Sequence, residues 1–413
     1  MSISSRFPKL AAAILLALAV AGRAETLEQI TAEALRESPQ LRLLEQDLAA
    51  ARGGVTSART FANPELSIAP GVKQVRESGR RNTEFHIEAG FSQLFKFPGK
   101  RALEIAIAGR EVRSTEIALE ALRFQLASLA RRDFYELLAA EKILETRSQQ
   151  VASAKEFAAS ARQRVESGFA GDFETVKSEA ELISARKAER EAKGRVAAAR
   201  VTLNLLLGRS ASASPQISGN LENTAPRGSS VDFTALALAR NPALRAQIIA
   251  AEKAGLSLRL TRFGKRPDFA LGPSLEYTDT EQIYGLSATI ALPFWDQKKG
   301  EIETATAGQR KALAELEKLR LEIEGTVAKA AGELQIAKDQ LALYSPEFLD
   351  HLRNFMRQAE QGYAQSATTL IIYLDAKRTY YDTLSDYYET VGKVAQSRAE
   401  LESAVGVPLD IKP

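Results

Sequence analysis

Two stretches in the second half of the chain decide the fold: DFALGPSLEY at residues 268–277 and YGLSATIAL at residues 284–292. In both stretches apolar and polar side chains alternate, so each predicts a β-strand with one apolar and one polar face. Two stretches of the first half, residues 65–72 and 84–92, alternate in the same way. The four segments, each about ten residues long, form two predicted strand pairs that lie far apart in the sequence.

The sequence contains an internal duplication, because its second half repeats landmarks of the first half in the same order. The matching segments are 38–42 with 241–245, 168–169 with 362–363, and 203–208 with 401–406. A stretch rich in Ser, Pro, Gly and Asn, residues 209–230, is interpreted as the linker between the halves. We therefore predict two repeats, residues 25–208 and residues 231–413. Each repeat would contain a short helix, a helix, two strands, a very long helix, a turn and a long helix.

Strong helix formers dominate both repeats, and residues 99–214 contain no proline. Four long helices are predicted: residues 101–166, 173–207, 299–361 and 368–405. The first would hold roughly 65 residues and reach about 100 Å. Pro346 lies inside the third helix and should kink or briefly break it.

Small residues recur along the first long helix at the 3-4-3-4 spacing of a coiled-coil seam. These residues are Val151, Ala154, Ala158, Ala161 and Val165. Alanines at a seam let two helix backbones come close. An ordinary two-stranded coiled coil in a filamentous or adaptor protein would show the same seam, so this pattern alone leaves both interpretations open.

The strands distinguish these interpretations. Their length and alternation are those of strands that cross an outer membrane, with the apolar face toward lipid and the polar face toward a wet lumen. A single half-buried strand of a soluble β-sandwich would show the same alternation. The flanking helices, however, are far too long to cover a sandwich. Four strands cannot enclose an open lumen. The predicted fold is therefore mainly α with a small β part: long antiparallel α-hairpins form a coiled-coil tunnel, and three subunits share a twelve-stranded barrel.

The N-terminal residues have the pattern of a secretory signal peptide, predicted at residues 1–24. Arg6 and Lys9 precede a short apolar run, and cleavage is expected after Ala24, with Ala21 as the alternative. Removal of the signal, which also contains Arg23, leaves 52 basic against 52 acidic residues. A neutral mature chain is a poor candidate for nucleic-acid binding, which needs a basic face. No later apolar run reaches the ~20 residues of a membrane-spanning helix.

The composition argues against chemistry at a bound metal or cofactor. The chain has no cysteine, and the residues that could supply imidazole or thioether ligands are His86, His351, Met1 and Met356. A dedicated transition-metal site is therefore not expected, and no cofactor is predicted. The sequence contains no nucleophile elbow, no His-Glu-x-x-His and no phosphate-binding loop, so it is not expected to be an enzyme.

The order of repeats, strand pairs and long helical hairpins resembles the TolC family of outer-membrane efflux proteins. The two junctions FPGKR (97–101) and LPFWDQKKGEI (292–302) are similar to the CzcC-like heavy-metal-resistance branch. The resemblance implies a passive trimeric duct in outer-membrane lipid that extends into the periplasm. It also implies a periplasmic adaptor protein and an inner-membrane proton-driven pump as partners. Divalent metal ions are the cargo that the branch suggests. A drug-efflux duct, a type I secretion duct and a periplasmic coiled-coil adaptor or structural protein remain alternatives.

Three groups of residues are candidates for function in such a duct. The hairpin tips, expected to dock the adaptor, contain Gly168, Phe169, Ala170, Gly362, Tyr363 and Ser366. The glycines could equally do no more than form the turns. The junctions between strands and helices contain Pro98, Gly99, Pro293, Trp295 and Gly300. The prolines and glycines there are interpreted as structural. Trp295, with Phe294, Phe95 and Phe97, would form an aromatic belt at the membrane surface or pack locally.

The third group is the channel constriction that the family forms where the last long helix begins. In the family, acidic side chains three residues apart line this constriction. The matching positions here are Ile372 and Asp375, so the resemblance implies one ring of three carboxylates beside an apolar ring. A carboxylate ring would favour cations, and an apolar ring would hinder water. The competing interpretation is that Asp375 pairs with Arg378 or Lys377 on a solvated helix face.

Overall fold

The computed structural model describes residues 24–77, 80–168, 171–221, 232–279 and 281–409. Its contacts divide the chain into two compact units, and each unit combines segments of both sequence repeats. The sheet unit takes residues 42–120 and 242–321. The hairpin unit takes the described residues of 1–41, 121–241 and 322–413. The long helices α4 (Lys100–Glu166) and α8 (Lys299–Ala342) contribute to both units.

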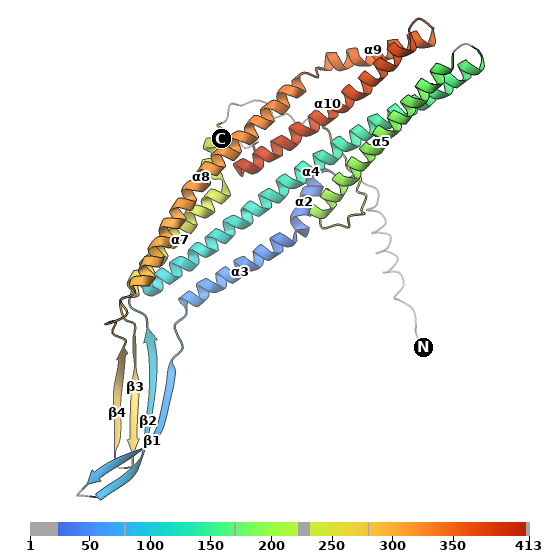
Figure 1. Ribbon diagram of the computed structural model, residues 1–413. Coiled ribbons are helices and arrows are strands. Elements are labelled where there is room, and N and C mark those ends of the chain that lie inside the picture. Colours follow the sequence, from blue (N-terminus) through green and yellow to red (C-terminus); the bar gives the residue numbers. More distant parts are fainter. Residues whose placement is uncertain (1–23, 78–79, 169–170, 222–231, 280, 410–413) are drawn as a thin grey trace, which may run out of the picture. The chain divides into compact units, whose positions relative to one another are not determined.

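The sheet unit contains one antiparallel sheet with the strand order β1–β2–β3–β4 (Figure 1). The strands are β1 (Glu65–Glu77), β2 (Arg80–Phe95), β3 (Phe269–Thr278) and β4 (Gln282–Ile290). The second hairpin has the predicted length. The expectation of about ten residues is wrong for β1 and β2, which have 13 and 16 residues. Their pairing continues from Lys73 opposite Glu84 to Glu77 opposite Arg80, because ladder hydrogen bonds need only backbone groups.

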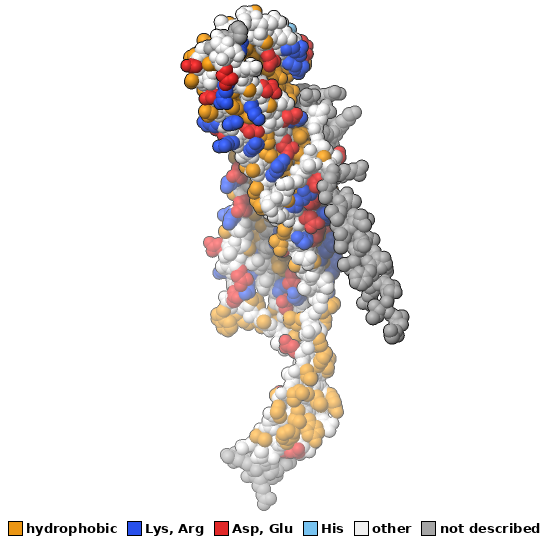
Figure 2. All heavy atoms as spheres, turned by 90° about the vertical axis from the view of Figure 1, so that its right-hand side faces the viewer, with side chains coloured by type: hydrophobic (Ala, Val, Ile, Leu, Met, Phe, Trp, Pro, Cys, Tyr) orange, Lys and Arg blue, Asp and Glu red, His pale blue; other side chains and the backbone are white. Residues whose placement is uncertain are grey.

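The predicted apolar face of the sheet is exposed in the single chain. Leu66, Val72 and Leu286 keep 69%, 73% and 89% of their surface accessible. Figure 2 shows hydrophobic side chains gathered over the sheet. The two hairpins join where β2 pairs with β3, and β1 and β4 each keep one edge without a partner strand in the described chain.

Helices of both repeats also meet in the sheet unit. These helices are α3 (Pro39–Arg59), α7 (Pro242–Phe263) and the first parts of α4 and α8. Ion pairs tie α7 to α4: Lys253 contacts Glu111, and Arg110 Nε lies 2.8 Å from Glu252 Oε2. These pairs are partly solvated, so they fix the pairing of the helices more than they stabilise the fold.

The hairpin unit consists of two antiparallel helical hairpins and two short helices (Figure 1). Besides the distal parts of α4 and α8, it contains α2 (Leu27–Glu37), α5 (Asp172–Leu206), α6 (Phe233–Arg240), α9 (Pro346–Ala364) and α10 (Leu370–Val405). The predicted break at Pro346 is confirmed. The chain leaves α8 after Ala342, and α9 begins at Pro346, where a missing N–H is harmless. The Ser345 hydroxyl caps α9 by accepting a hydrogen bond from Phe348 N at 3.1 Å.

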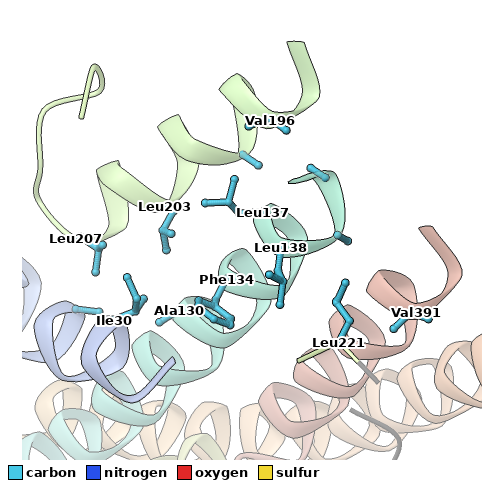
Figure 3. Packing of buried hydrophobic residues seen from close by; sticks show 14 residues of the cluster. Ile30, Ala130, Phe134, Leu137, Leu138, Val196, Leu203, Leu207, Leu221 and Val391 are labelled. Carbon is cyan, nitrogen blue, oxygen red and sulfur yellow. The ribbon is translucent and has the colours of Figure 1, made fainter. Parts of the chain in front are cut away.

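Apolar side chains of several helices form the core of the hairpin unit (Figure 3). Ile30 of α2, Leu137 of α4 and Leu203 of α5 are completely buried there. Along the distal part of α4, the seam alanines are buried as predicted: Ala154, Ala158 and Ala161 keep at most 5% of their surface accessible. Within the described chain, no helix has both the length and the apolar character needed to span a bilayer.

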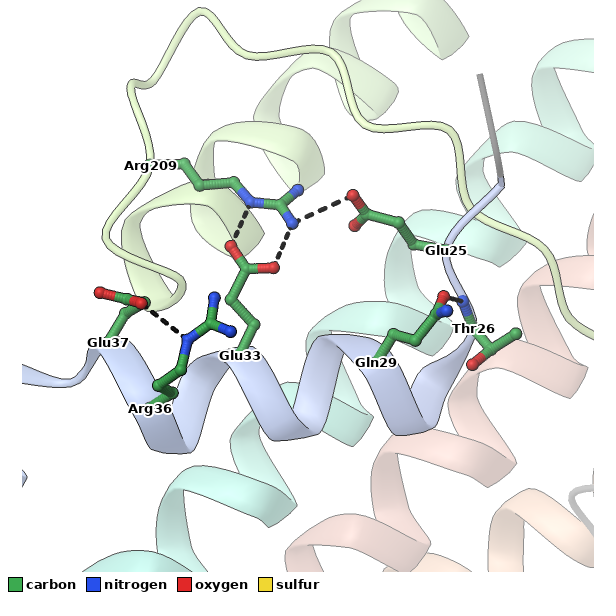
Figure 4. A network of polar contacts seen from close by, with 7 residues as sticks. All are labelled: Glu25, Thr26, Gln29, Glu33, Arg36, Glu37 and Arg209. Carbon is green, nitrogen blue, oxygen red and sulfur yellow. Dashed lines mark hydrogen bonds and ion pairs between the residues drawn. The ribbon is translucent and has the colours of Figure 1, made fainter. Parts of the chain in front are cut away.

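The described part of the predicted linker packs against residues 25–33. Arg209 donates from Nε to Glu33 Oε1 at 2.7 Å and from Nη2 to Glu25 Oε1 at 3.0 Å (Figure 4). Leu221 reaches the core and keeps 5% of its surface accessible. The rest of the predicted linker, residues 222–230, lies outside the described residues, as do residues 1–23 of the predicted signal peptide.

Candidate functional site

The first hairpin end joins α4 to α5. Gly168 takes the left-handed conformation with φ of 73°, and its N–H donates to Val165 O at 3.0 Å. No atom of the described residues would contact a side chain at this position, so the backbone conformation is the reason for glycine here. Phe169 and Ala170, which were predicted to dock an adaptor, lie outside the described residues.

The second hairpin end joins α9 to α10, and it uses its glycine differently. Gly362 is helical, but a Cβ there would lie 2.7 Å from Thr368 Oγ1. The left-handed residue is Ser366, with φ of 61°. The carbonyl oxygen of Gly362 accepts hydrogen bonds from the N–H groups of Ala367 and Thr368 at 2.7 and 3.1 Å. Gly362 therefore allows a close approach, and Ser366 makes the turn at an exposed position.

Tyr363 does not face the tip surface. Its ring is buried, stacks on Tyr373 with centroids 5.0 Å apart, and meets Phe157 edge-on at 5.7 Å. Phe157, Tyr363 and Tyr373 come from α4, α9 and α10, and we call them the aromatic cluster. Burial, together with the nearby Glu174 carboxylate, raises the pKa of Tyr363 to about 12. The cluster joins the two hairpins close to their ends.

Sequence reasoning missed one member of this region, Lys377. Its side chain is 1% accessible, and Nζ lies 3.3 Å from the Tyr373 hydroxyl. The ammonium also faces the Tyr373 and Phe157 rings at 5.3 and 5.7 Å. The spacing of Tyr373 and Lys377 by one helical turn was the available signal. It does not reveal burial, because a lysine in a polar helix is normally solvated.

The constriction candidates lie on the first turns of α10, whose N-terminus is capped by Thr369. Ile372 and Asp375 are both exposed in the single chain. Asp375 lines a groove between α5 and α10 with Phe173, Lys177 and Arg378. Neither predicted partner pairs with it: Arg378 Nη2 contacts Glu181 Oε2 at 3.3 Å, and Lys377 packs against the aromatic cluster. Among the described residues, Asp375 makes no ion pair of 4.0 Å or less.

The first junction between strand and helix is tightly packed within the sheet unit. Lys100 Nζ lies 2.8 Å from Asp268 Oδ1, which also accepts a hydrogen bond from Phe97 N at 2.7 Å. Pro98 precedes Gly99, which is left-handed with φ of 96°, and a Cβ there would lie 3.2 Å from the Phe263 ring. This junction holds the end of β2 against the start of β3.

The second junction is open. Trp295 is 94% accessible and Phe294 is 69% accessible, and the two rings meet edge-on at 6.2 Å. Pro293 follows β4, and Gly300 lies in the first turn of α8 with open space around it. Of the other two aromatic residues considered for a belt, Phe95 stacks on Phe269 at 5.7 Å, and Phe97 faces the Arg266 guanidinium at 4.9 Å. Trp295 thus contacts its neighbour Phe294 but stays almost fully exposed within the described chain.

The polar face of the sheet brings acidic side chains and one histidine together. Glu88 lies opposite Glu276, and His86 Nε2 is 3.2 Å from Glu88 Oε1. Lys73 Nζ is 3.8 Å from Glu276 Oε1. Within the described ranges, no group of three or more His, Cys, Asp or Glu side chains has the geometry to hold a metal ion. The arrangement is that of a charged, water-facing surface.

The sequence profile of a family described as "Outer membrane efflux protein" matches residues 30–209 and 234–407, which include nearly all of both repeats. The chain belongs to the outer membrane efflux protein family. This confirms the predicted TolC-type family and the outer-membrane placement, with the long helices as the periplasmic part. It is an efflux channel protein, and members of the family are ducts without enzymatic activity. No curated protein matches the chain.

Solved structures of outer-membrane channels share the fold. CusC, whose structures concern transmembrane channel formation, has a TM-score of 0.75 at 18% identity, with 92% of each chain covered. CmeC of Campylobacter jejuni has a TM-score of 0.75 at 15% identity, covering 92% of this chain and 85% of its own. MtrE of Neisseria gonorrhoeae, in its open state, has a TM-score of 0.76 at 18% identity, covering 93% and 89%. The predicted fold, long helices with four antiparallel strands, is confirmed.

Proposed function

We propose that three copies of this chain form one duct that exports divalent metal ions across the outer membrane. The trimer is inferred from the sheet, which has four strands, two open edges and an exposed apolar face. An open sheet edge in lipid leaves backbone groups without partners, which costs several kcal/mol for each group. Pairing β1 of one subunit with β4 of the next removes every edge, and three copies supply twelve strands.

Asp375 and Ile372 are the proposed constriction. Both are exposed on the first turns of α10, and no basic side chain forms an ion pair with Asp375 within the described chain. Three such carboxylates around one axis would concentrate cations, while three Ile372 side chains would form an apolar ring. A cation-selective entrance suits metal ions. Because the described residues form no metal-holding group, the duct would pass these ions without storing them.

The hairpin ends are the proposed docking sites for a periplasmic adaptor, which would connect the duct to an inner-membrane proton-driven pump. Gly168 and Ser366 remain exposed candidates for this contact. Gly362 and Tyr363 contribute indirectly, because one allows the close turn and the other is buried in the aromatic cluster. The exposed pair Phe294 and Trp295 is proposed to lie at the membrane surface, where aromatic rings are favoured.

Deletion of the gene tests the cargo. We expect cells without it to become sensitive to divalent metals such as zinc, cobalt or cadmium, because the pump would lose its exit through the outer membrane. The measurement is the minimal inhibitory concentration of each metal, with hydrophobic drugs tested in parallel. Re-expression of the chain should restore tolerance. Unchanged metal tolerance together with new drug sensitivity would assign the duct to drug efflux instead.

A further inference from the structure

Lys377 is a buried charge that the proposed transport path does not use. It lies on α10 with 1% of its side chain accessible, and its nearest polar partner is the Tyr373 hydroxyl at 3.3 Å. Two aromatic faces partly stabilise the ammonium, which lies 5.3 Å from the Tyr373 ring and 5.7 Å from the Phe157 ring. Within the part of the chain that the structure describes, no carboxylate lies within ion-pair distance of Lys377.

Acidic groups face Lys377 from each neighbouring helix without contacting it. They are Glu156 on α4, Glu181 on α5 and Glu360 on α9. Glu181 is already paired with Arg378 at 3.3 Å. Tyr373 and two further tyrosines of this region, Tyr363 and Tyr381, have pKa values raised chiefly by burial, so they stay neutral near pH 7. None of these groups cancels the cost of burying the charge.

We propose that Lys377 biases the aromatic cluster at the hairpin ends toward opening. Its buried ammonium, contacted by no carboxylate, weakens the aromatic cluster that joins α4, α9 and α10. The cluster therefore opens and recloses more readily than an apolar core of the same size. Asp375, two residues away on α10, is the proposed constriction. That link to the duct rests on the proposed function, whereas the bias itself does not.

The pH dependence has a defined direction. Burial lowers the pKa of Lys377 from its ordinary 10.5 to about 8, although Glu360, Glu181 and Glu156 oppose the shift. The packed cluster thus prefers neutral lysine, and the open state prefers charged lysine. The bias toward opening is complete below about pH 8, weakens as the pH rises from about 8 to 10.5, and is absent above that range.

Thiol labelling measures this bias directly. The chain has no cysteine, so Ala359→Cys, at a buried α9 position beside the cluster, supplies a single reporter. Lys377→Met keeps the apolar stem and removes the charge. The parent is the Ala359→Cys protein that keeps Lys377, and the variant carries Lys377→Met in addition. If opening exposes Lys377 fully, the thiol of the parent should react up to about 300-fold faster than that of the variant at pH 7, and about 30-fold faster at pH 9. Intrinsic thiol chemistry cancels in this ratio.

Lys377→Arg is the matched control, because arginine stays charged at both pH values. Relative to an unfolded reference, the labelling rate of the Lys377→Arg variant should stay fast at pH 9. The relative labelling rate of the parent should fall about tenfold between pH 7 and pH 9. This comparison also serves if Lys377→Met fails to assemble. Equal labelling of parent and Lys377→Met, or a ratio that is the same at pH 7 and pH 9, would overturn the proposal.

In planar bilayers, Lys377→Met should also reduce the open probability. Altered labelling with an unchanged open probability would support the bias and contradict its link to the opening of the duct.

Discussion

Leu286→Arg should keep the protein out of the outer membrane. Leu286 lies near the middle of β4 and keeps 89% of its surface accessible, so its side chain would face lipid in the closed barrel. An arginine at the middle of the bilayer costs about 2–4 kcal/mol in a barrel strand. A trimer carries this cost three times. Fractionation on a density gradient should show at least a tenfold loss of the protein from the outer-membrane fraction. A tenfold loss is the expected minimum, because about 2 kcal/mol corresponds to more than a factor of ten.

Ser287→Arg is the matched control for this variant. Ser287 is the next residue of β4 and points to the opposite face, where its hydroxyl donates to Gly272 O at 3.2 Å. Facing the lumen, an arginine there would remain hydrated. Normal insertion of the Ser287→Arg variant is therefore expected. If both variants inserted equally well, or if Ser287→Arg alone failed, the assignment of the two faces would be wrong.

Asp375→Asn should remove the cation selectivity of the channel. The substitution deletes three carboxylates from the proposed constriction while keeping the side-chain size. Because opposite charges no longer gather there, the ratio of potassium to chloride permeability should fall several-fold toward one. The measurement is the reversal potential of single channels in a salt gradient.

Asp375→Glu supplies the comparison, since it keeps the charge and should keep the selectivity. Asp375 has no ion pair among the described residues, so its removal leaves no buried charge without a partner. The trimer should therefore assemble normally in both variants. A selectivity unchanged in Asp375→Asn would place the constriction elsewhere, since an ion-selective ring cannot lose its charge without effect.

The strands and long helices could be predicted from the sequence because their signals are local. Alternation at residues 268–277 and 284–292 specified β3 and β4, and Pro346 specified the break between α8 and α9. The outer parts of β1 and β2 were missed. From Lys73 to Asn82 the side chains are mostly polar, and backbone pairing extends the hairpin without any side-chain pattern.

The hairpin ends could be predicted only in part. Glycine at position 168 fits the left-handed turn found there, but at the second end the left-handed residue is Ser366. Gly362 is explained by the close approach of Thr368, which depends on the path of the chain. The burial of Tyr363 and Lys377 depends on contacts among α4, α9 and α10. Such long-range contacts leave no periodic signal in a single sequence.

The particle mass in detergent tests the shared duct most directly. Light scattering on the purified mature protein, corrected for bound detergent, should give the mass of three chains, because only a closed barrel satisfies the edges of β1 and β4. A monodisperse particle with the mass of one chain would contradict the shared barrel, and with it the constriction formed by three Asp375 side chains.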